Sequence, residues 1–207
     1  MGKSTVIVGY SGHAFVILDA LATNGVKVQA YVDIEEKQKN PYNLKYIGKE
    51  RDHINFLREN EAFVSVGEND VRARICQFLL DSQVHLINVV HSRANVSESI
   101  TIGKNVFISG GANVNSQAYL ADGVIVNTGA VVEHECYIEE YAHVAPGAVL
   151  AGNVSVGAKS FVGANCVVRQ GVKIGKNVVI GAGTVVVDDV PDGLVVVGNP
   201  QKVLYGK

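Results

Sequence analysis

Two histidines stand where they could take part in proton transfer. Glu133-His134-Glu135 places an imidazole between two carboxylates within an otherwise aliphatic stretch, and His143 follows nine residues after His134. Histidine has an unperturbed pKa of about 6.5, and a neighbouring carboxylate raises its basicity and fixes its tautomer. Such a base suits acyl transfer, because the attacking amine or hydroxyl loses a proton as it adds to the carbonyl. The alternative is an exposed polar turn.

A second polar group follows the first strand-like run, TVIVG. The segment GYSGH would place backbone N–H groups and Ser11 at the N-terminus of a helix, which favours a phosphate. Asp33 ends the next strand-like run, where nucleotide-binding α/β folds often hold an acid against a ribose. The segment is not G-x-G-x-x-G, so a dinucleotide is only weakly indicated. A loop without a ligand is the alternative.

The elements around these loops alternate in type over residues 1–85. Strands are predicted at TVIV, VKVQAYV, EAFVSV and VHLINVV, and helices at HAFVILDALAT and NDVRARICQFLLDS, with Asn69 as the N-cap of the second helix. Residues 35–60 are polar and predict a connection with one helical turn. The apolar face of the first helix is expected to include Val16, Leu18 and Leu21. This order predicts a parallel sheet in a small Rossmann-like domain.

The second part, residues 86–207, has a different period. From Val90 to Val186 every sixth residue is aliphatic, which gives 17 consecutive positions without an insertion. The residue two places before each is mostly small or valine, and glycine often follows. Three such hexads make one coil of a parallel β-helix with a triangular section. A valine-rich sandwich is the alternative, but its turns would break the register.

The spacing of the two histidines has a consequence in such a prism. Nine residues are half of a coil of about 18 residues, so His134 and His143 would lie on nearly opposite sides of one chain. They could converge only between parallel prisms, with His134 of one chain facing His143 of its neighbour. The spacing therefore predicts active sites between subunits.

The hexad pattern resembles that of left-handed β-helix acyltransferases, whose members are typically trimers that use acetyl-CoA. The segment VNTGAVVEHECYIEEYAHVAPGAVLAGNVSVG is similar to the core of sugar N-acetyltransferases of the bacillosamine pathway and of related sialic acid O-acetyltransferases. This resemblance implies that His134 is the general base and Glu135 the carboxylate that increases its basicity. It implies that acetyl-CoA contacts His143, Ala164 and Ala182.

The resemblance extends to the N-terminal part, where the family opens with G-x-S/G-G-H and holds the nucleotide of a nucleotide-linked amino sugar. Phe15 stands where many relatives have lysine, and Ile34 stands where some have a second acid. The identity of the nucleotide, whether UDP, dTDP or GDP, is therefore left open. Lys202, in a tail that also resembles the family ending, would lie near CoA or be an ordinary surface lysine. The substrate-binding residues that the resemblance implies are Ser11, Gly12, His13, Asp33, Ile34, Gly67, Asn69 and Asn127.

The function implied is acetyl-CoA-dependent N-acetylation of a nucleotide-linked 4-amino-4,6-dideoxy sugar by direct attack. O-acetylation of sialic acid or a related sugar is the alternative, because both reactions need a base and acetyl-CoA. A zinc carbonic anhydrase would need three converging histidines, whereas the repeats offer His134 and His143, with His91 at their start. No metal is therefore expected. A non-catalytic role would predict no acetyl-CoA turnover.

Composition excludes several partners. The net charge is −2 and the 18 lysines and arginines are scattered, so neither nucleic acid nor a membrane surface is expected. No apolar run approaches the roughly 18 residues of a membrane span, and no signal-peptide pattern is present. Cys76, Cys136 and Cys166 are isolated and predict reduced thiols. We expect a cytoplasmic homotrimer that binds a small nucleotide sugar.

Overall fold

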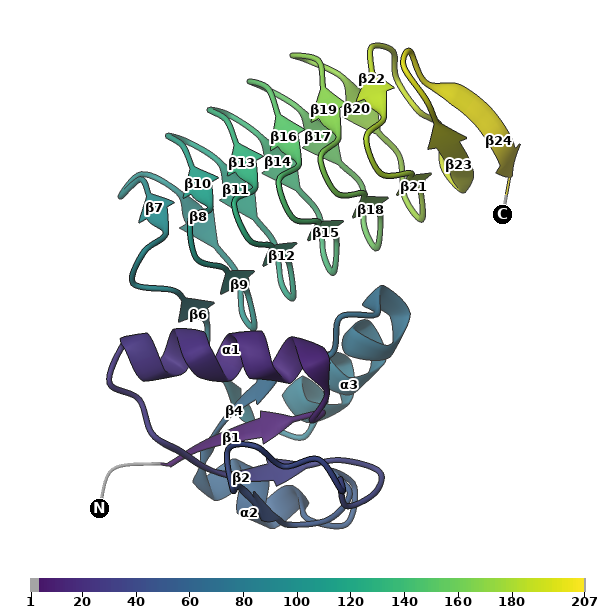
Figure 1. The fold of residues 1–207 in the computed structure, drawn as a ribbon. Coiled ribbons are helices and arrows are strands. Elements are labelled where there is room, and N and C mark those ends of the chain that lie inside the picture. Colours follow the sequence, from purple (N-terminus) through teal and green to yellow (C-terminus); the bar gives the residue numbers. More distant parts are fainter. Residues whose placement is uncertain (1–3, 207) are drawn as a thin grey trace.

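The computed structural model describes residues 4–206, which form an α/β part and a β-helix in contact with each other (Figure 1). The α/β part contains a five-stranded parallel sheet in the order β3-β2-β1-β4-β5. Its strands are β1 (Thr5–Val8), β2 (Val28–Val32), β3 (Lys45–Tyr46), β4 (Glu61–Val64) and β5 (His85–Leu86). Its helices are α1 (Gly12–Thr23), α2 (Ile54–Glu59) and α3 (Asn69–Asp81).

The alternation of side chains along the strands explains the layers. Ile7 and Phe63 pack with α1 on one face of the sheet, whereas Val6 and Val64 pack with α2 and α3 on the other. The α1 layer also contacts Phe107 of the β-helix, so α1 lies between the sheet and the β-helix. This confirms the Rossmann-like part of the predicted fold.

Three local predictions need correction. Val16 is 38% exposed, because the buried side of α1 is formed by Ala14, Ile17, Leu18, Ala20 and Leu21. Residues 35–60 contain the short strand β3 as well as α2. The segment VHLINVV is two strands in different sheets, β5 and β6 (Val89–Val90), because Asn88 between them hydrogen-bonds to Gly103 and Val106 of the first coils. The division of the chain near residue 85 stays a proposal.

The hexad region is a left-handed parallel β-helix with three faces, as predicted. We call the face against the α/β part face 1, and the next two along the chain faces 2 and 3. Face 1 contains β6, β9 (Phe107–Ile108), β12 (Ile125–Val126), β15 (His143–Val144), β18 (Phe161–Val162) and β21 (Val179–Ile180), and is extended by β23 (Leu194–Val197) and β24 (Lys202–Gly206).

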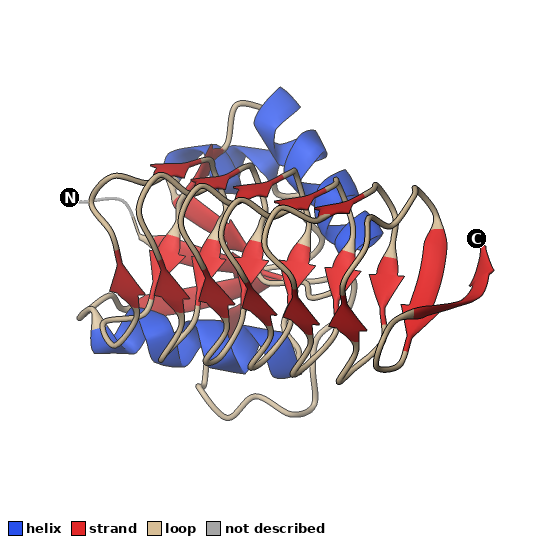
Figure 2. Ribbon diagram, turned by 90° about the horizontal axis from the view of Figure 1, so that it is seen from above, coloured by secondary structure: helices blue, strands red, loops and turns tan. Residues whose placement is uncertain are grey.

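The other faces follow the same register. Face 2 contains β7 (Asn95–Val96), β10 (Asn113–Val114), β13 (Val131–Val132), β16 (Val149–Leu150), β19 (Val167–Val168) and β22 (Val185–Val186). Face 3 contains β8 (Thr101–Ile102), β11 (Tyr119–Leu120), β14 (Tyr137–Ile138), β17 (Ser155–Val156) and β20 (Lys173–Ile174). Seen from above, the coils stack along one axis (Figure 2).

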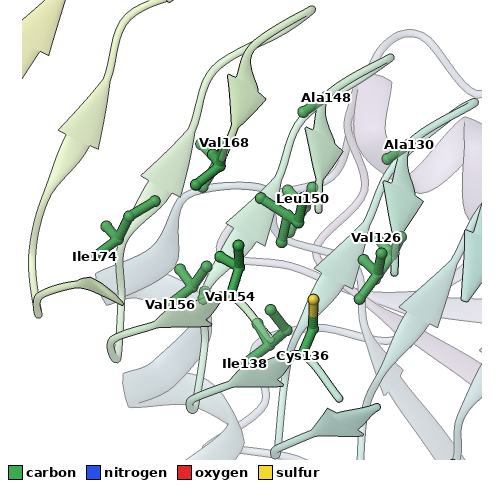
Figure 3. Packing of buried hydrophobic residues seen from close by; sticks show 14 of the residues in the cluster. Val126, Ala130, Cys136, Ile138, Ala148, Leu150, Val154, Val156, Val168 and Ile174 are labelled. Carbon is green, nitrogen blue, oxygen red and sulfur yellow. The ribbon is translucent and has the colours of Figure 1, made fainter. Parts of the chain in front are cut away.

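The predicted period is the register of the prism. The second residue of every strand from β6 to β22 is an aliphatic residue of the hexad series, and each strand from β6 to β19 pairs with the strand one coil later, as Val126 pairs with Val144. Most of these side chains fill the interior together with small residues such as Ala130, Ala148 and Cys136 (Figure 3). A truncation such as Leu150→Ala would cost about 2–5 kcal/mol.

The corners of the prism require an unusual backbone. Every sixth residue from Asn105 to Gly183 has a positive φ, which is the left-handed conformation that glycine and asparagine tolerate best. Most of these positions hold glycine or asparagine. Glu135, directly after His134, is an exception with φ of 59°. Glu135 therefore adopts a backbone conformation that glycine would adopt with less strain.

Among residues 4–206, no helix has the length and apolar character that crossing a membrane requires. The predicted cytoplasmic location stays a prediction.

Candidate active site

His134 and Glu135 lie at the corner between faces 2 and 3, which we call the 2–3 corner. His134 Nδ1 is 3.1 Å from Glu135 Oε2, and the side chains are 52% and 65% exposed. When Nδ1–H donates to the carboxylate, Nε2 carries the lone pair and can accept a proton. The pair thus has the form of a general base with its orienting carboxylate.

Gly152 supports this imidazole from the next coil. Asn153 N donates to His134 O at 2.8 Å, which fixes the two coils in register. A Cβ atom at residue 152 would lie 2.5 Å from both Cε1 and Nε2 of His134, so the ring occupies the space that a side chain would need. The position of the imidazole therefore depends on a glycine that sequence reasoning did not single out.

The buried His143 and the half-buried His13 form a second histidine pair. His143 is the outward residue of β15 on face 1, and its ring centroid lies 6.2 Å from that of His13 of α1. His143 Nε2 is 3.1 Å from Nδ2 of Asn127. Burial, followed by the charge of Arg72, lowers the pKa of His13 to about 4 and that of His143 to about 3. Both rings are therefore neutral near pH 7.

Arg72 of α3 joins the two parts of the chain beside these histidines. Its guanidinium is buried and donates five hydrogen bonds of 2.7–3.1 Å without a carboxylate partner. The acceptors are the backbone oxygens of Gly123, Val66, Gly67 and Tyr141 and the side-chain oxygen of Asn69. All five N–H groups of the guanidinium donate hydrogen bonds, so the oxygen atoms of these acceptors stabilise its charge at the junction.

Gly67 and Asn69 lie on the α/β side of this junction. A Cβ atom at Gly67 would come within 3.7 Å of the His13 ring, and Asn69 Nδ2 donates to Lys159 O at 2.9 Å. Both residues line a pocket of about 360 Å³ between the start of α3 and β18. Asn69 is not the N-cap, because its amide is used for the β-helix; Glu68 caps α3 through bonds from Asp70 N and Val71 N.

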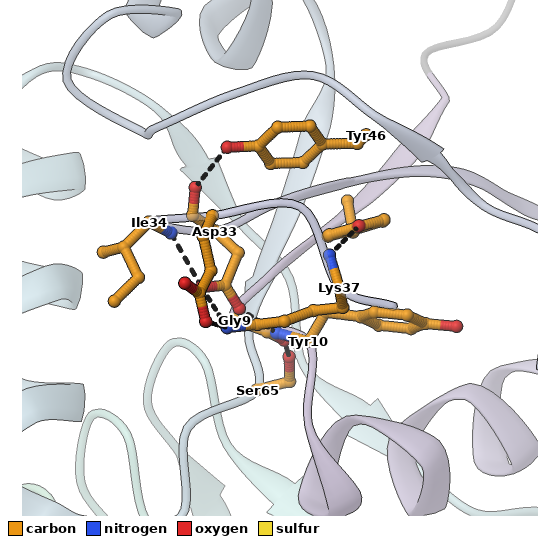
Figure 4. A network of polar contacts seen from close by, with 9 residues as sticks. Gly9, Tyr10, Asp33, Ile34, Lys37, Tyr46 and Ser65 are labelled. Atoms are coloured by element: carbon orange, nitrogen blue, oxygen red, sulfur yellow. Dashed lines mark hydrogen bonds and ion pairs between the residues drawn. The ribbon is translucent and has the colours of Figure 1, made fainter. Parts of the chain in front are cut away.

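The carboxylate of Asp33 holds the GYSGH loop in place through hydrogen bonds (Figure 4). Asp33 Oδ2 accepts a hydrogen bond from Tyr10 N at 2.8 Å, and Oδ1 accepts one from Ile34 N and pairs with Lys37. Ser65 also donates to the carbonyl of Gly9. The carboxylate therefore helps to fix the backbone conformation of the loop.

The start of α1 has free donors. Ser11 is its N-cap residue, but its side chain makes no capping hydrogen bond, and a Cβ atom at Gly12 would meet no atom within 4 Å. Ile34 is 68% exposed beside this loop. Backbone N–H groups and the Ser11 hydroxyl can thus reach an anion at this end of the helix.

Ala164 and Ala182 lie one above the other at the corner between faces 1 and 2, the 1–2 corner. Gly183 N donates to Ala164 O at 2.8 Å, and the same stacking continues back through Pro146 to Thr128. Lys202 is exposed in β24. The column of small residues at this corner leaves room for an extended ligand beside the backbone.

One chain brings together only some of the predicted residues. His13, Gly67, Asn69, Asn127 and His143 meet where the α/β part packs on face 1. The His134–Glu135 pair lies at another corner of the prism, as the half-coil spacing predicts. Sequence reasoning missed Arg72 and Gly152, since neither belongs to a motif; an arginine within an apolar helix face is the one signal that could have pointed to Arg72.

Among the described residues, no group of three or more histidine, cysteine or acidic side chains could hold a metal ion. The three cysteines are buried and unpaired by disulfides. Burial raises the pKa of the Cys76 thiol to about 12, which disfavours a nucleophilic thiolate. The histidines therefore remain the candidates for proton transfer.

Comparison with known proteins gives two family matches. The PglD N-terminal domain matches residues 5–79, and the bacterial transferase hexapeptide (six repeats) matches residues 153–188. A search among curated proteins gave no significant match.

Several solved structures are similar over nearly the whole chain. PerB of Caulobacter crescentus, solved with CoA and GDP-perosamine, is 35% identical, with 98% of each chain covered and a TM-score of 0.93. The acetyltransferase domain of PglB from Neisseria gonorrhoeae, in complex with acetyl coenzyme A, is 34% identical over 99% of this chain and 100% of that chain, with a TM-score of 0.91. WeeI of Acinetobacter baumannii, at 21% identity, 98% and 100% coverage and a TM-score of 0.89, shares the fold.

Proposed function

Because this chain belongs to the family of hexapeptide-repeat nucleotide-sugar N-acetyltransferases with a PglD-type N-terminal domain, we propose that it acetylates the amine of a nucleotide-linked amino sugar from acetyl-CoA. The similar structures carry CoA with GDP-perosamine, or acetyl coenzyme A. We take a 4-amino-4,6-dideoxy sugar as the acceptor. The observation that carries the proposal is the His134–Glu135 pair, whose geometry leaves Nε2 able to accept a proton.

The reaction follows from this geometry. The sugar amine attacks the thioester carbonyl, a C–N bond forms, and Nε2 of His134 accepts the proton that the amine loses. Glu135 stabilises the imidazolium through Nδ1–H. The C–S bond then breaks, and the CoA thiolate takes the proton from the imidazolium. No metal is needed for this sequence of steps.

The remaining predicted residues hold the two substrates. His143, Ala164 and Ala182 would contact acetyl-CoA along the 1–2 corner, and Asn127 would lie in the same pocket as His143. A neutral, buried His143 suits hydrogen bonding rather than proton transfer. The nucleotide would lie against a set of residues in which Asp33 also shapes the loop: Ser11, Gly12, His13, Asp33, Ile34, Gly67 and Asn69.

A homotrimer would complete the site. Face 2 presents outward valines on four successive coils, at Val131, Val149, Val167 and Val185, and Val167 is 44% exposed. When three prisms turn this face toward a common axis, the 1–2 corner of each meets the 2–3 corner of its neighbour. His134 of one subunit would then reach Asn127 and His143 of the next.

The decisive experiment is turnover with purified protein. Acetyl-CoA is supplied with GDP-, UDP- and dTDP-linked 4-amino-4,6-dideoxy sugars, and thiol release and product mass are measured. We expect an alkali-stable acetamide from at least one acceptor. An alkali-labile ester would favour the O-acetylation alternative, and no transfer to any amino sugar or sialic acid would overturn the proposal.

A further inference from the structure

A hollow of about 830 Å³ lies beside α1, and its lining contains none of the catalytic or substrate-binding residues proposed above. We call it the α1 groove. Figure 1 shows α1 lying along the coils that contain β6, β9 and β12, and the groove lies between this helix and the turns that follow those strands. Its walls include Val16, Asp19 and Thr23 from α1, and Arg93, Ser109 and Thr128 from the 1–2 corner.

The helix wall of the groove leads back to the nucleotide loop. Gly12, Val16, Asp19 and Thr23 are spaced at i, i+4, i+7 and i+11, so they lie on one face of α1. Space remains open at Gly12, where an added Cβ would meet no atom within 4 Å. Asp19 lies about 10 Å further along the helix axis than Gly12. A ligand whose phosphates lie at the start of α1 can therefore extend into the groove.

The opposite wall leads to the proposed acetyl-CoA site. Thr128 O accepts from Gly147 N, Pro146 O from Asn165 N, and Ala164 O from Gly183 N, so one continuous column of turns joins the groove to Ala182. Asn127 directly precedes Thr128 of the groove, and its amide contacts His143. Donor and acceptor can thus approach the same point from opposite ends of the 1–2 corner.

The groove carries groups suited to a polyhydroxylated sugar ring. Asp19 Oδ1 accepts a hydrogen bond from Tyr42 at 2.7 Å, and its other oxygen has no partner among the described residues. Arg93 is exposed and forms no ion pair within residues 4–206. Ser109 and Thr128 share a hydrogen bond of 3.1 Å at the corner. A carboxylate oxygen, a guanidinium and two hydroxyls therefore face one space.

We propose that the α1 groove binds the amino-sugar ring of the nucleotide sugar, with Asp19 accepting hydrogen bonds from its hydroxyl groups. This rests on the proposed function, and it adds a determinant of sugar specificity that is separate from the nucleotide loop. Arg93 and Thr128 bound the ring on the side of the 1–2 corner. The amine then faces the junction where the acetyl group arrives.

Two variants test this assignment. Asp19→Asn removes the charge but keeps an oxygen for Tyr42, and Val16→Phe fills the groove from a side chain that is already partly exposed. Asp81→Asn and Val203→Phe are matched controls at exposed sites far from the groove. Binding of the nucleotide sugar and of the nucleoside diphosphate alone is measured by calorimetry, and KM for acetyl-CoA by steady-state kinetics.

Both groove variants should bind the nucleotide sugar about 10- to 100-fold more weakly, as expected for losing a hydrogen bond to a charged group or the space for the ring. Affinity for the nucleoside diphosphate and KM for acetyl-CoA should not change. Wild-type affinity of Val16→Phe and Asp19→Asn for the nucleotide sugar would overturn the groove assignment. Nucleotide-sugar binding that depends on the groove, without any acetyl transfer, would instead overturn the proposed function.

Discussion

The two histidine regions of this chain differ in exposure and in the charge beside them. His134 is half exposed at a corner of the prism and its Nδ1 is paired with the carboxylate of Glu135. His143 is buried and His13 is half-buried at the junction of the α/β part and the β-helix, where burial and the charge of Arg72 lower the pKa of both. The second environment disfavours a protonated imidazole, whereas the first leaves the imidazole open to solvent beside a carboxylate.

The difference separates two tasks that histidine can perform. A general base must be reached by the acceptor and must stabilise the proton that it receives, which a carboxylate neighbour allows. A buried neutral imidazole offers one donor and one acceptor in fixed positions, as His143 does toward Asn127. We therefore propose that His134 transfers the proton and that His13 and His143 position the substrates.

The largest expected effect is on the chemical step. His134→Ala should lower kcat by about 10²- to 10⁴-fold, because the amine loses its proton acceptor, while acetyl-CoA still binds. Glu135→Gln should lower it less, since the imidazole remains. Steady-state kinetics and CoA titrations measure both. A His134→Ala enzyme with more than about half of the wild-type kcat would exclude the role of general base.

The next effect concerns the junction itself. Arg72→Met should lower the free energy of unfolding by about 3 kcal/mol or more, because several buried carbonyl groups lose their donor. It should also raise the pKa of His13 and His143, because the positive charge of Arg72 disfavours protonation of both rings. Denaturant unfolding and NMR titration of the imidazoles measure the two effects.

Arg74→Met is the control, since Arg74 is exposed on the same helix. Equal losses of stability in the two variants would contradict the role of Arg72 as the donor to these buried carbonyl groups. Unchanged imidazole titrations in Arg72→Met would contradict its effect on the pKa of His13 and His143.

A smaller and more selective effect is expected at Gly152. Gly152→Ala would push the His134 ring from its place, and a displacement of about 1 Å can cost as much as 10²-fold in rate. The ring can swing outward, so stability should change little. In a His134→Ala background the same substitution should have no further effect on kcat, which a double-mutant cycle measures. Additive losses would show that Gly152 acts independently of the imidazole.

The smallest effect near neutral pH concerns stability. Folding lowers the pKa of His13 to about 4 and of His143 to about 3, so the unfolded chain takes up protons first as the pH falls below about 6.5. The contribution of these neutral rings to the free energy of unfolding is complete above that pH, and it is lost as the pH falls toward 4 and 3. Unfolding free energies measured from pH 7.5 to 4.5 should decline less steeply in a His13→Gln/His143→Gln variant. An identical decline would contradict the burial of neutral rings.

The sequence predicts the β-helix well because its register is local. Each hexad places one aliphatic side chain inside and one turn at a corner, so a period of six is sufficient to assign all strands from β6 to β22. The same register predicts that His134 and His143 lie at different corners. The α/β part is predicted at the level of its main strands and helices, from apolar runs and loop residues.

What the sequence does not predict depends on contacts between distant segments. Asn69 looks like a helix cap, but its side-chain amide donates a hydrogen bond to the backbone oxygen of Lys159, which is 90 residues away. The hydrogen bond from Tyr10 N to the Asp33 carboxylate, across 23 residues, is likewise not visible in the sequence. The parts of Arg72 and Gly152 follow only from the packing of the two parts and of successive coils. Such long-range partners leave no periodic signal.

Complementation between two inactive variants tests the shared site most directly. His134→Ala chains and Asn127→Ala chains are co-expressed with different tags, and mixed trimers are purified and assayed for acetyl transfer. If His134 of one subunit serves the Asn127–His143 pocket of the next, about one in three sites of each purified mixed trimer contains both intact halves, and activity returns to about that fraction of wild type. Mixed trimers as inactive as either parent would contradict the account, because they would show that each site is built from one chain.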